Sequence, residues 1–407
     1  MALQMFENRP AEPELSGEKG PDPYANAMGL LTVTVILVSL GLTMLYSASF
    51  VLSGINFFKK QLIWVGGGIV IGTAAFLTGY RRLSKYRGLF LLICWAMLVG
   101  ALFFAPVNGA RRWIRFVLPA LGEVSIQPSE LTKIALCLFV AGYCTDFARS
   151  FTLLKHWRGI VPLAFYVAVT GGLVWAGKDM GTCLLILICA ACIMVAGGLY
   201  LRYALIGGVG VLGYFTLHIL KDPERFSRIA TISDPSKDGL GAGYQLYRSL
   251  MALGSGGWFG LGFGQGRLKI KYLPEQHTDF ILAVVGEELG LVTIWLIIIL
   301  YLLWGYFALR IALGAKTRLG MLLGCGLTVA IQVQALINLA VISGSAPTKG
   351  MPAPFISFGG SSMIASLIAV GLLMSIVMDS LTPGYNISLQ NKLKHFFHIG
   401  GSAHHDE

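Results

Sequence analysis

The sequence has little charge for its length. Only 13% of its 407 residues are Asp, Glu, Lys or Arg, whereas 55% are hydrophobic. A soluble globular chain carries about 25% charged residues. This shortage of charge excludes an ordinary soluble domain and favours a polytopic membrane protein, and the mean hydropathy of +0.71 agrees with that interpretation.

Metal-site patterns, nucleic-acid-binding features and internal repeats are also missing from the sequence. The seven cysteines all lie in apolar runs, where they are expected as small core residues. Cys189 and Cys192 match a C-x-x-C pattern, but they lie in mid-span without the soluble context of a redox motif. Residues 208–213 fit a dinucleotide-binding pattern, and close helix packing explains their glycines better.

Ten apolar runs are long enough to cross a bilayer. They cover residues 28–49, 61–79, 88–107, 131–148, 159–176, 181–199, 203–220, 279–306, 319–343 and 362–379. The predicted fold is therefore an all-α polytopic membrane protein with about ten transmembrane helices. We expect a membrane domain over residues 27–380, with a large extracytoplasmic loop at 221–279 between spans 7 and 8. The polar segments 1–26 and 381–407 are expected to be disordered cytoplasmic tails, and the first shows no signal-peptide pattern.

Basic residues cluster after the second, fourth and eighth runs. The clusters are Arg81, Arg82, Lys85 and Arg87; Arg149, Lys155 and Arg158; and Arg310, Lys316 and Arg318. The positive-inside rule then places both termini in the cytoplasm. Cations also occur on the predicted outer side, namely Arg111 and Arg112 in one short loop and Lys349 in another. The sequence leaves open whether they hold an anion or are plain surface charge.

The stretch from Leu273 to Phe280 ends the long loop and leads into the eighth apolar run. Thr278 and Asp279 are good N-cap residues for the helix that follows. The carboxylate of Asp279 would then lie at the mouth of a span, beside the positive end of a helix dipole. Two readings remain open for this acid, a helix cap and a catalytic group. His277 and Thr278 are likewise expected either to position a substrate or to cap the helix.

Three other polar features have specific expectations. Glu130 and Lys133 are three residues apart, so they share a helix face and are predicted to form a structural ion pair. The glycine run at 254–266 either brings backbone N–H groups close to a ligand or forms a re-entrant segment. Residues 347–362, which include Ser361, are rich in Gly, Pro and hydroxyl groups and should line a cavity.

Taken together, these stretches resemble the SEDS family (shape, elongation, division and sporulation) of polytopic peptidoglycan glycosyltransferases. The matching motifs are Tyr46–Ser49, Asn108–Trp113, Gln127–Leu131 with Lys133, Gly243–Gln245, Gly254–Gly257, Leu273–Phe280, Gly286–Gly290 and Pro354–Ser362. They occur in the family's order across nearly all of the membrane region. Pro347–Gly350 resembles the FtsW cell-division branch more than the RodA elongation branch. Lys178 and Arg248 depart from the residues usual at their positions.

The resemblance implies that the protein polymerises lipid II into glycan strands during septal cell-wall synthesis, on the outer face of the cytoplasmic (inner) membrane. Asp279 matches the family's essential aspartate and would act as general base. In falling order, the candidates for stabilising the leaving undecaprenyl diphosphate are Arg111, Arg112, Arg248 and Lys349. The further substrate-binding candidates are His277, Thr278 and Ser361.

No cofactor is certain, and a divalent cation, Mg or Mn, is left open. The expected partners are lipid II, undecaprenyl-diphosphate-linked glycan, a class B penicillin-binding transpeptidase and divisome regulatory proteins. The alternatives are a RodA-like elongation polymerase, a lipid II flippase and a scaffold that recruits division proteins without chemistry. Intramembrane acids and broken helices fit a transporter, but no inverted repeat is evident and the polar residues concentrate on the outer side.

Overall fold

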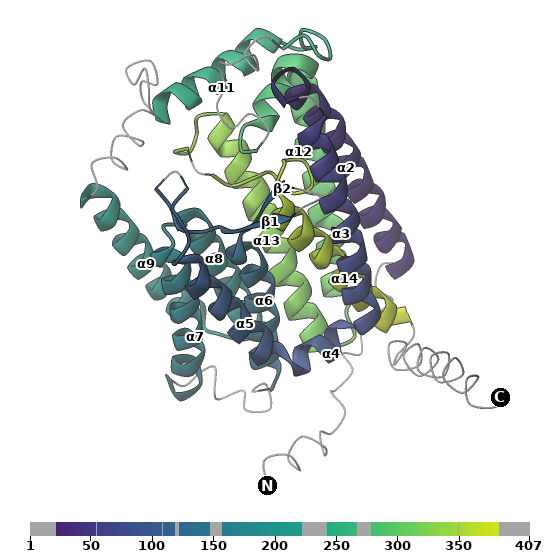
Figure 1. Cartoon of the computed structure of the whole chain (residues 1–407). Coiled ribbons are helices and arrows are strands. Elements are labelled where there is room, and N and C mark those ends of the chain that lie inside the picture. The colour runs from purple at the N-terminus through teal and green to yellow at the C-terminus, as the bar shows by residue number, and fades with distance from the viewer. Residues whose placement is uncertain are drawn as a thin grey trace, which may run out of the picture.

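The computed structural model describes residues 22–53, 55–107, 109–118, 122–146, 157–221, 242–266, 278–348 and 350–381. Two of the predicted site residues, His277 and Lys349, lie outside these ranges. The described part is a bundle of helices, with one two-stranded hairpin near its middle (Figure 1).

Each of the ten predicted apolar runs coincides with a helix. In chain order these are α2 (Pro23–Ser53), α3 (Asn56–Thr78), α5 (Arg87–Ala101), α6 (Pro128–Asp146), α7 (Trp157–Ala176), α8 (Met180–Ala196), α9 (Leu201–Lys221), α12 (Ile281–Leu313), α13 (Arg318–Ile342) and α14 (Gly360–Leu381). In the described part of the chain, seven helices are long and apolar enough to cross a membrane, while α5 and α8 are apolar but shorter. The predicted helical, multi-pass membrane fold is confirmed.

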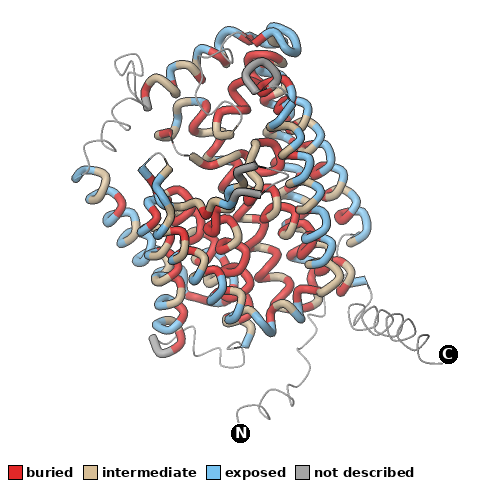
Figure 2. Tube along the Cα trace, viewed as in Figure 1, coloured by how far each residue is buried: buried red, intermediate tan, exposed pale blue. Residues whose placement is uncertain are grey.

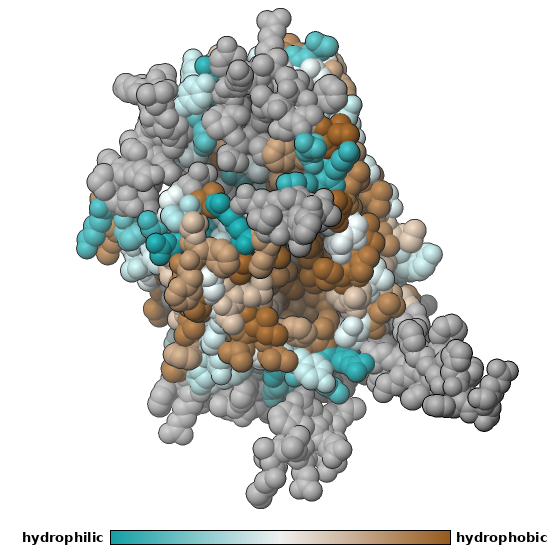
Figure 3. Space-filling view, viewed as in Figure 1, coloured by the Kyte–Doolittle hydropathy of each residue, from teal (hydrophilic) through white to brown (hydrophobic). Residues whose placement is uncertain are grey.

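Burial divides the helices into central and peripheral ones. Helix α14 has 72% of its most apolar window buried, whereas α9 has 6%. Figure 2 shows the same division, with buried residues in the middle of the bundle and exposed ones on its outer helices. Hydrophobic residues dominate the lower half of the face in Figure 3, as expected where lipid surrounds the helices. Helix α6 is the least apolar of the ten, and it can carry polar residues because Glu130, Thr132 and Lys133 are buried inside the protein instead of facing lipid.

The pairing of α3 with α14 depends on glycine. A β-carbon added at Gly371 would lie 2.1 Å from the carbonyl oxygen of Gly72, so the two backbones are in direct contact there. Small residues allow this close approach between membrane helices. The contact fixes α14, whose first turn contributes Ser361 to the polar hollow described below.

Helix α12 contains a kink at Gly290, where φ is +81°. A β-carbon at Gly290 would lie 2.4 Å from the backbone nitrogen of Gly260, because the glycine run packs directly against the helix. Leu261 N–H donates to the carbonyl of Glu287, and Gly262 N–H donates to that of Glu288, at 2.9 and 3.0 Å. The described part of the glycine run therefore approaches the α12 backbone, as a re-entrant segment would.

Several elements were not predicted. The loop after α5 forms a hairpin of β1 (Ile114–Leu118) and β2 (Gly122–Ile126), antiparallel with Ile114 opposite Ile126. Two further helices are α4 (Tyr80–Lys85) and α11 (Ala242–Gly256), the latter within the predicted large loop.

The boundary of the predicted N-terminal tail also needs correction, because α2 begins at Pro23 rather than after residue 26. Pro23 is the first helical residue, and Asp22 Oδ1 accepts a hydrogen bond from Tyr24 N–H at 3.0 Å. An acidic cap before a helical proline is a known helix start.

Candidate active site

A polar hollow of about 720 Å³ lies where three connections meet. The segment before β1 contributes Arg112 and Trp113, and the residues before α12 contribute Thr278 and Asp279. The stretch from Gly350 into the first turn of α14 forms the rest of the wall, with Ser361 among its residues. Residues 350–362 of the polar, Gly- and Pro-rich segment thus line a cavity, as the composition of that segment predicts.

The backbone of Asp279 is held in place from α13. Asn338 Nδ2 donates to the carbonyl of Asp279 at 2.9 Å and to that of Met351 at 2.8 Å. The N-cap of α12 is Phe280, so Asp279 precedes the cap by one residue instead of forming it. Asp279 is partly buried and lines the hollow beside the N-terminus of α12, where the helix dipole favours negative charge.

Arg112 faces the hollow from the opposite wall. A β-carbon at Gly350 would lie 2.9 Å from Arg112 Nη2 and 3.1 Å from Asp279 Oδ2. The cation and the acid therefore border one small space, and only a residue without a side chain leaves that space free. Because both are near one point, they can contact the same bound molecule.

The guanidinium of Arg112 is only partly satisfied by the residues that the structure describes. Its Nη1 lies 3.9 Å from Asp179 Oδ1, which is an ion pair beyond hydrogen-bonding distance. Its Nε is buried and has no hydrogen-bond partner among the described residues. Since an unsatisfied buried donor is unfavourable, a bound anion would supply the partner that the described residues do not.

A buried network holds the wall behind Arg112. Asp179 caps α8, accepting from Thr182 N–H, and it also accepts from Gln127 Nε2 at 2.7 Å and Ser129 Oγ at 2.9 Å. Ser361 Oγ accepts from the backbone N–H of Gln127 at 2.8 Å. This network joins the start of α6 to the starts of α8 and α14.

A second buried network lies one turn deeper along α6. Lys133 Nζ lies 2.7 Å from Glu130 Oε2, and both side chains are at most 2% exposed. Lys133 also donates to Gln334 Oε1, while Gln334 Nε2 donates to the carbonyl of Pro352 at 2.9 Å. The ion pair thus supports the segment that contains Gly350, as a structural role requires.

The structure brings Asp279, Thr278, Arg112 and Ser361 together around the hollow. It does not bring Arg111 into the wall, since that exposed side chain donates to the carbonyl of Leu102 at 3.4 Å.

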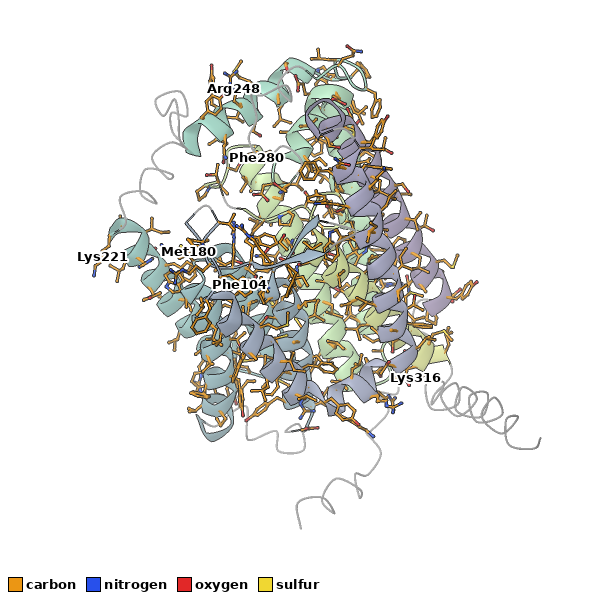
Figure 4. All side chains as sticks on the ribbon, viewed as in Figure 1. Phe104, Met180, Lys221, Arg248, Phe280 and Lys316 are labelled. Carbon is orange, nitrogen blue, oxygen red and sulfur yellow. The ribbon has the colours of Figure 1, made fainter. Side chains whose placement is uncertain are left out.

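Arg248 also lies outside the wall, on α11, with its guanidinium 5.0 Å from the centre of the Tyr244 ring. Figure 4 shows Arg248 on α11 above Phe280. Among the described residues, no group of three or more His, Cys, Asp or Glu side chains is arranged to hold a metal ion.

Sequence reasoning missed two positioning residues, Gln334 and Asn338. They are buried polar residues four apart in a largely apolar span, so they share one face of α13. Polar side chains inside membrane helices are usually functional. The four-residue spacing of Gln334 and Asn338 was the signal in the sequence that could have identified them.

Comparison with known proteins places this geometry in a family. The family model described as FtsW/RodA/SpoVE, cell cycle protein, matches residues 28–381. Stage V sporulation protein E of Bacillus subtilis is 35% identical over 357 residues, covering 85% of this chain and 95% of that protein. A probable peptidoglycan glycosyltransferase FtsW of Trichlorobacter lovleyi is 36% identical, with coverages of 85% and 92%.

Solved structures agree with this placement. A chain from a peptidoglycan synthase complex that coordinates polymerization and crosslinking has a TM-score of 0.72 at 25% identity, covering 87% of this chain and 98% of that one. The rod shape determining protein RodA of Thermus thermophilus has a TM-score of 0.62 at 25% identity, with coverages of 86% and 96%. The chain belongs to the FtsW/RodA/SpoVE family of cell cycle proteins.

Proposed function

We propose that this protein is a peptidoglycan glycosyltransferase that polymerises lipid II, with Asp279 as the general base. Relatives at 36% identity over most of the chain are named probable peptidoglycan glycosyltransferases. The single observation that carries the proposal is the shared space at Gly350, where Asp279 Oδ2 and Arg112 Nη2 approach one point. A base and a cation at one position are what this transfer needs.

In the proposed reaction, the carboxylate of Asp279 accepts the proton of the 4-hydroxyl of an incoming N-acetylglucosamine. That oxygen forms a bond to the anomeric carbon of the growing chain. The bond from this carbon to the diphosphate oxygen breaks, and undecaprenyl diphosphate leaves with the electron pair. The negative charge that develops on the leaving group needs a nearby cation.

Arg112 is our candidate for that cation. In the described part of the chain its Nε has no partner, and the ion pair that it forms there, to Asp179, is 3.9 Å long. A guanidinium can donate two parallel hydrogen bonds to phosphate oxygens. Ser361 and Thr278 lie on the same hollow and are proposed to contact the sugar or diphosphate.

We place this hollow on the extracytoplasmic side of the inner membrane, with both termini in the cytoplasm. Helix α6 begins at Pro128 beside the hollow and ends at Asp146, near the basic residues of α4. The positive-inside rule puts that basic end in the cytoplasm. A role at the division septum, beside a class B penicillin-binding transpeptidase and divisome regulators, follows from the resemblance to the FtsW branch.

The test is glycan synthesis by the full-length chain in proteoliposomes together with its cognate transpeptidase. Asp279→Asn removes the base but keeps the side-chain size, so polymer formation should fall by about 10²- to 10⁴-fold. Asp22→Asn is a matched control, because Asp22 is an exposed cap of α2. Polymerisation by Asp279→Asn at the wild-type rate would overturn the proposal, and so would translocation of lipid II by the wild type without polymer.

A further inference from the structure

A second hollow, of about 590 Å³, lies at the other end of the bundle. Arg81 and Lys85 of α4 and Arg87 at the start of α5 form one side, and Thr145 and Asp146 at the end of α6 form the other. Nothing in the proposed glycan chemistry uses these residues. Three cations around one hollow therefore need a separate explanation.

The two hollows are separated by the length of a membrane helix. Helix α6 connects them, and its 19 residues correspond to about 28 Å at 1.5 Å per residue. Figure 1 shows α4 at the lower end of the bundle, away from the β1–β2 hairpin. The basic hollow thus lies at the opposite membrane surface from Asp279, at the end that the positive-inside rule assigns to the cytoplasm.

Charge at this hollow is not balanced. Arg81 Nη2 lies 2.7 Å from Asp379 Oδ2, and Arg87 is paired with Asp146. Lys85 is exposed and has no ion-pair partner in the described ranges. The side chain of Arg81 is 50% exposed, so its outer surface can still contact a ligand. Among the described residues around the hollow, one positive charge is left over, which suits an anion.

Packing against α6 fixes the inner wall. A β-carbon at Gly142 would lie 2.6 Å from Arg87 Cδ and 2.8 Å from Ser84 Oγ, so these side chains rest directly on the helix backbone. Only the missing side chain of Gly142 allows this arrangement. Arg87 is therefore held against α6 at one wall of the hollow, while Arg81 and Lys85 remain accessible at its mouth.

Exposed apolar side chains occur on and just before α5, whose first residue, Arg87, lines the basic hollow. Tyr86, Leu89 and Ile93 are 54%, 55% and 47% exposed. Their spacing of three and four residues places Leu89 and Ile93 on one face of α5, continuing from Tyr86. A ligand that fits both features has a negatively charged head and hydrocarbon chains.

We propose that the basic hollow binds the phosphate headgroup of an anionic phospholipid of the cytoplasmic leaflet, with its acyl chains along the exposed face of α5. Basic pockets between membrane helices on the cytoplasmic side are known to bind such headgroups. Inorganic phosphate shares the headgroup chemistry but makes no use of the apolar face. The proposal concerns binding and does not depend on the glycosyltransferase activity.

The test is competition between phosphatidylglycerol and phosphatidylcholine with the same acyl chains, measured by native mass spectrometry of the full chain in neutral detergent. We expect the wild type to prefer phosphatidylglycerol at least about fivefold, which is the effect of one surface charge. Lys85→Glu should remove that preference. Lys316→Glu changes the net charge equally, lies at the same end of the molecule (Figure 4) but outside the hollow, and should keep it.

A steric variant separates the hollow from the general charge of the surface. Thr145→Phe fills the space without changing charge, and it should lower phosphatidylglycerol binding as Lys85→Glu does. Equal binding of the two lipids by the wild type would overturn the proposal. The proposal would also be overturned if Lys85→Glu and Lys316→Glu lost the preference for phosphatidylglycerol to the same degree. Protection of the chain against heat by millimolar inorganic phosphate, to the same degree as by phosphatidylglycerol, would identify free phosphate as the ligand and also overturn it.

Discussion

The carboxylate of Asp279 and the guanidinium of Arg112 border the same face of Gly350, at 3.1 and 2.9 Å from the position that a β-carbon would occupy. These residues come from segments more than 160 positions apart in the sequence. Asn338 holds the Asp279 backbone, and the Gln127–Asp179 network lies behind Arg112. Two independent supports therefore position the proposed base and the proposed cation.

Gly350→Ala should lower activity without unfolding the protein. The added methyl group would meet the ends of two flexible side chains, which can move, so the free energy of unfolding should change by less than about 0.5 kcal/mol. The methyl group would also displace Asp279 or Arg112 by a few tenths of an ångström or more, and small misplacements can cost about 10²-fold in rate. Glycan synthesis measures the expected loss of activity, and thermal unfolding measures the expected small change in stability. Gly100→Ala, at a glycine with open space, is the control.

Arg112→Gln should reduce kcat for glycan synthesis by about 10²- to 10³-fold, because it removes a donor to the leaving diphosphate. Arg111→Gln changes the net charge equally, yet that side chain lies outside the wall of the hollow. We expect a loss of less than about threefold for Arg111→Gln. Steady-state polymerisation by the two variants, side by side, decides the matter. Equal decreases of kcat in the two variants would show that the segment before β1 acts only through its total charge.

The positions of the spans could be predicted from the sequence because lipid requires long apolar helices, and all ten runs became helices. The ion pair of Glu130 with Lys133 also followed from local spacing. The position of Asp279 just before a membrane helix followed from the end of the polar loop, whereas its proposed role as a base rests on the family resemblance. The hairpin β1–β2 was missed because it lies in a short loop where turn and membrane-interface signals dominate.

The choice between Arg111 and Arg112 could not be made from the sequence. The two are adjacent and chemically identical, and only the path of the chain before β1 directs one toward Asp179 and the other toward Leu102. The role of Gly350 depends on the same long-range packing. Local patterns carry no information about which distant side chains approach one glycine.

Lys133→Met should destabilise the protein strongly, because it leaves the carboxylate of Glu130 buried without its cation. Breaking a buried pair in this way costs about 3–5 kcal/mol. The double variant Glu130→Gln with Lys133→Met removes both charges, so it should recover much of that loss. Thermal unfolding in detergent measures both. If adding Glu130→Gln to Lys133→Met lowered the stability as much as Glu130→Gln does alone, the two residues would be acting independently.

Stability should fall at alkaline pH through Tyr80, which lies on α4 outside the membrane spans. Burial raises the pKa of Tyr80 well above its usual value, and so does the hydrogen bond that its hydroxyl donates to Asp379 at 2.6 Å. An unfolded tyrosine has a pKa of about 10. The folded state thus favours the neutral phenol. The contribution of Tyr80 to the free energy of unfolding is fully present below about pH 10 and is lost as the pH rises toward the folded pKa.

Tyr80→Phe should therefore lower the stability at neutral pH by about 1–3 kcal/mol, because Asp379 loses a buried donor. The same variant should show a shallower decrease of Tm between about pH 9.5 and 11.5 than the wild type, since it lacks the phenol whose ionisation favours unfolding. Tyr86→Phe, at the exposed residue that follows α4, serves as the control and should keep the wild-type slope. An unchanged slope in Tyr80→Phe would mean that other groups govern the alkaline transition.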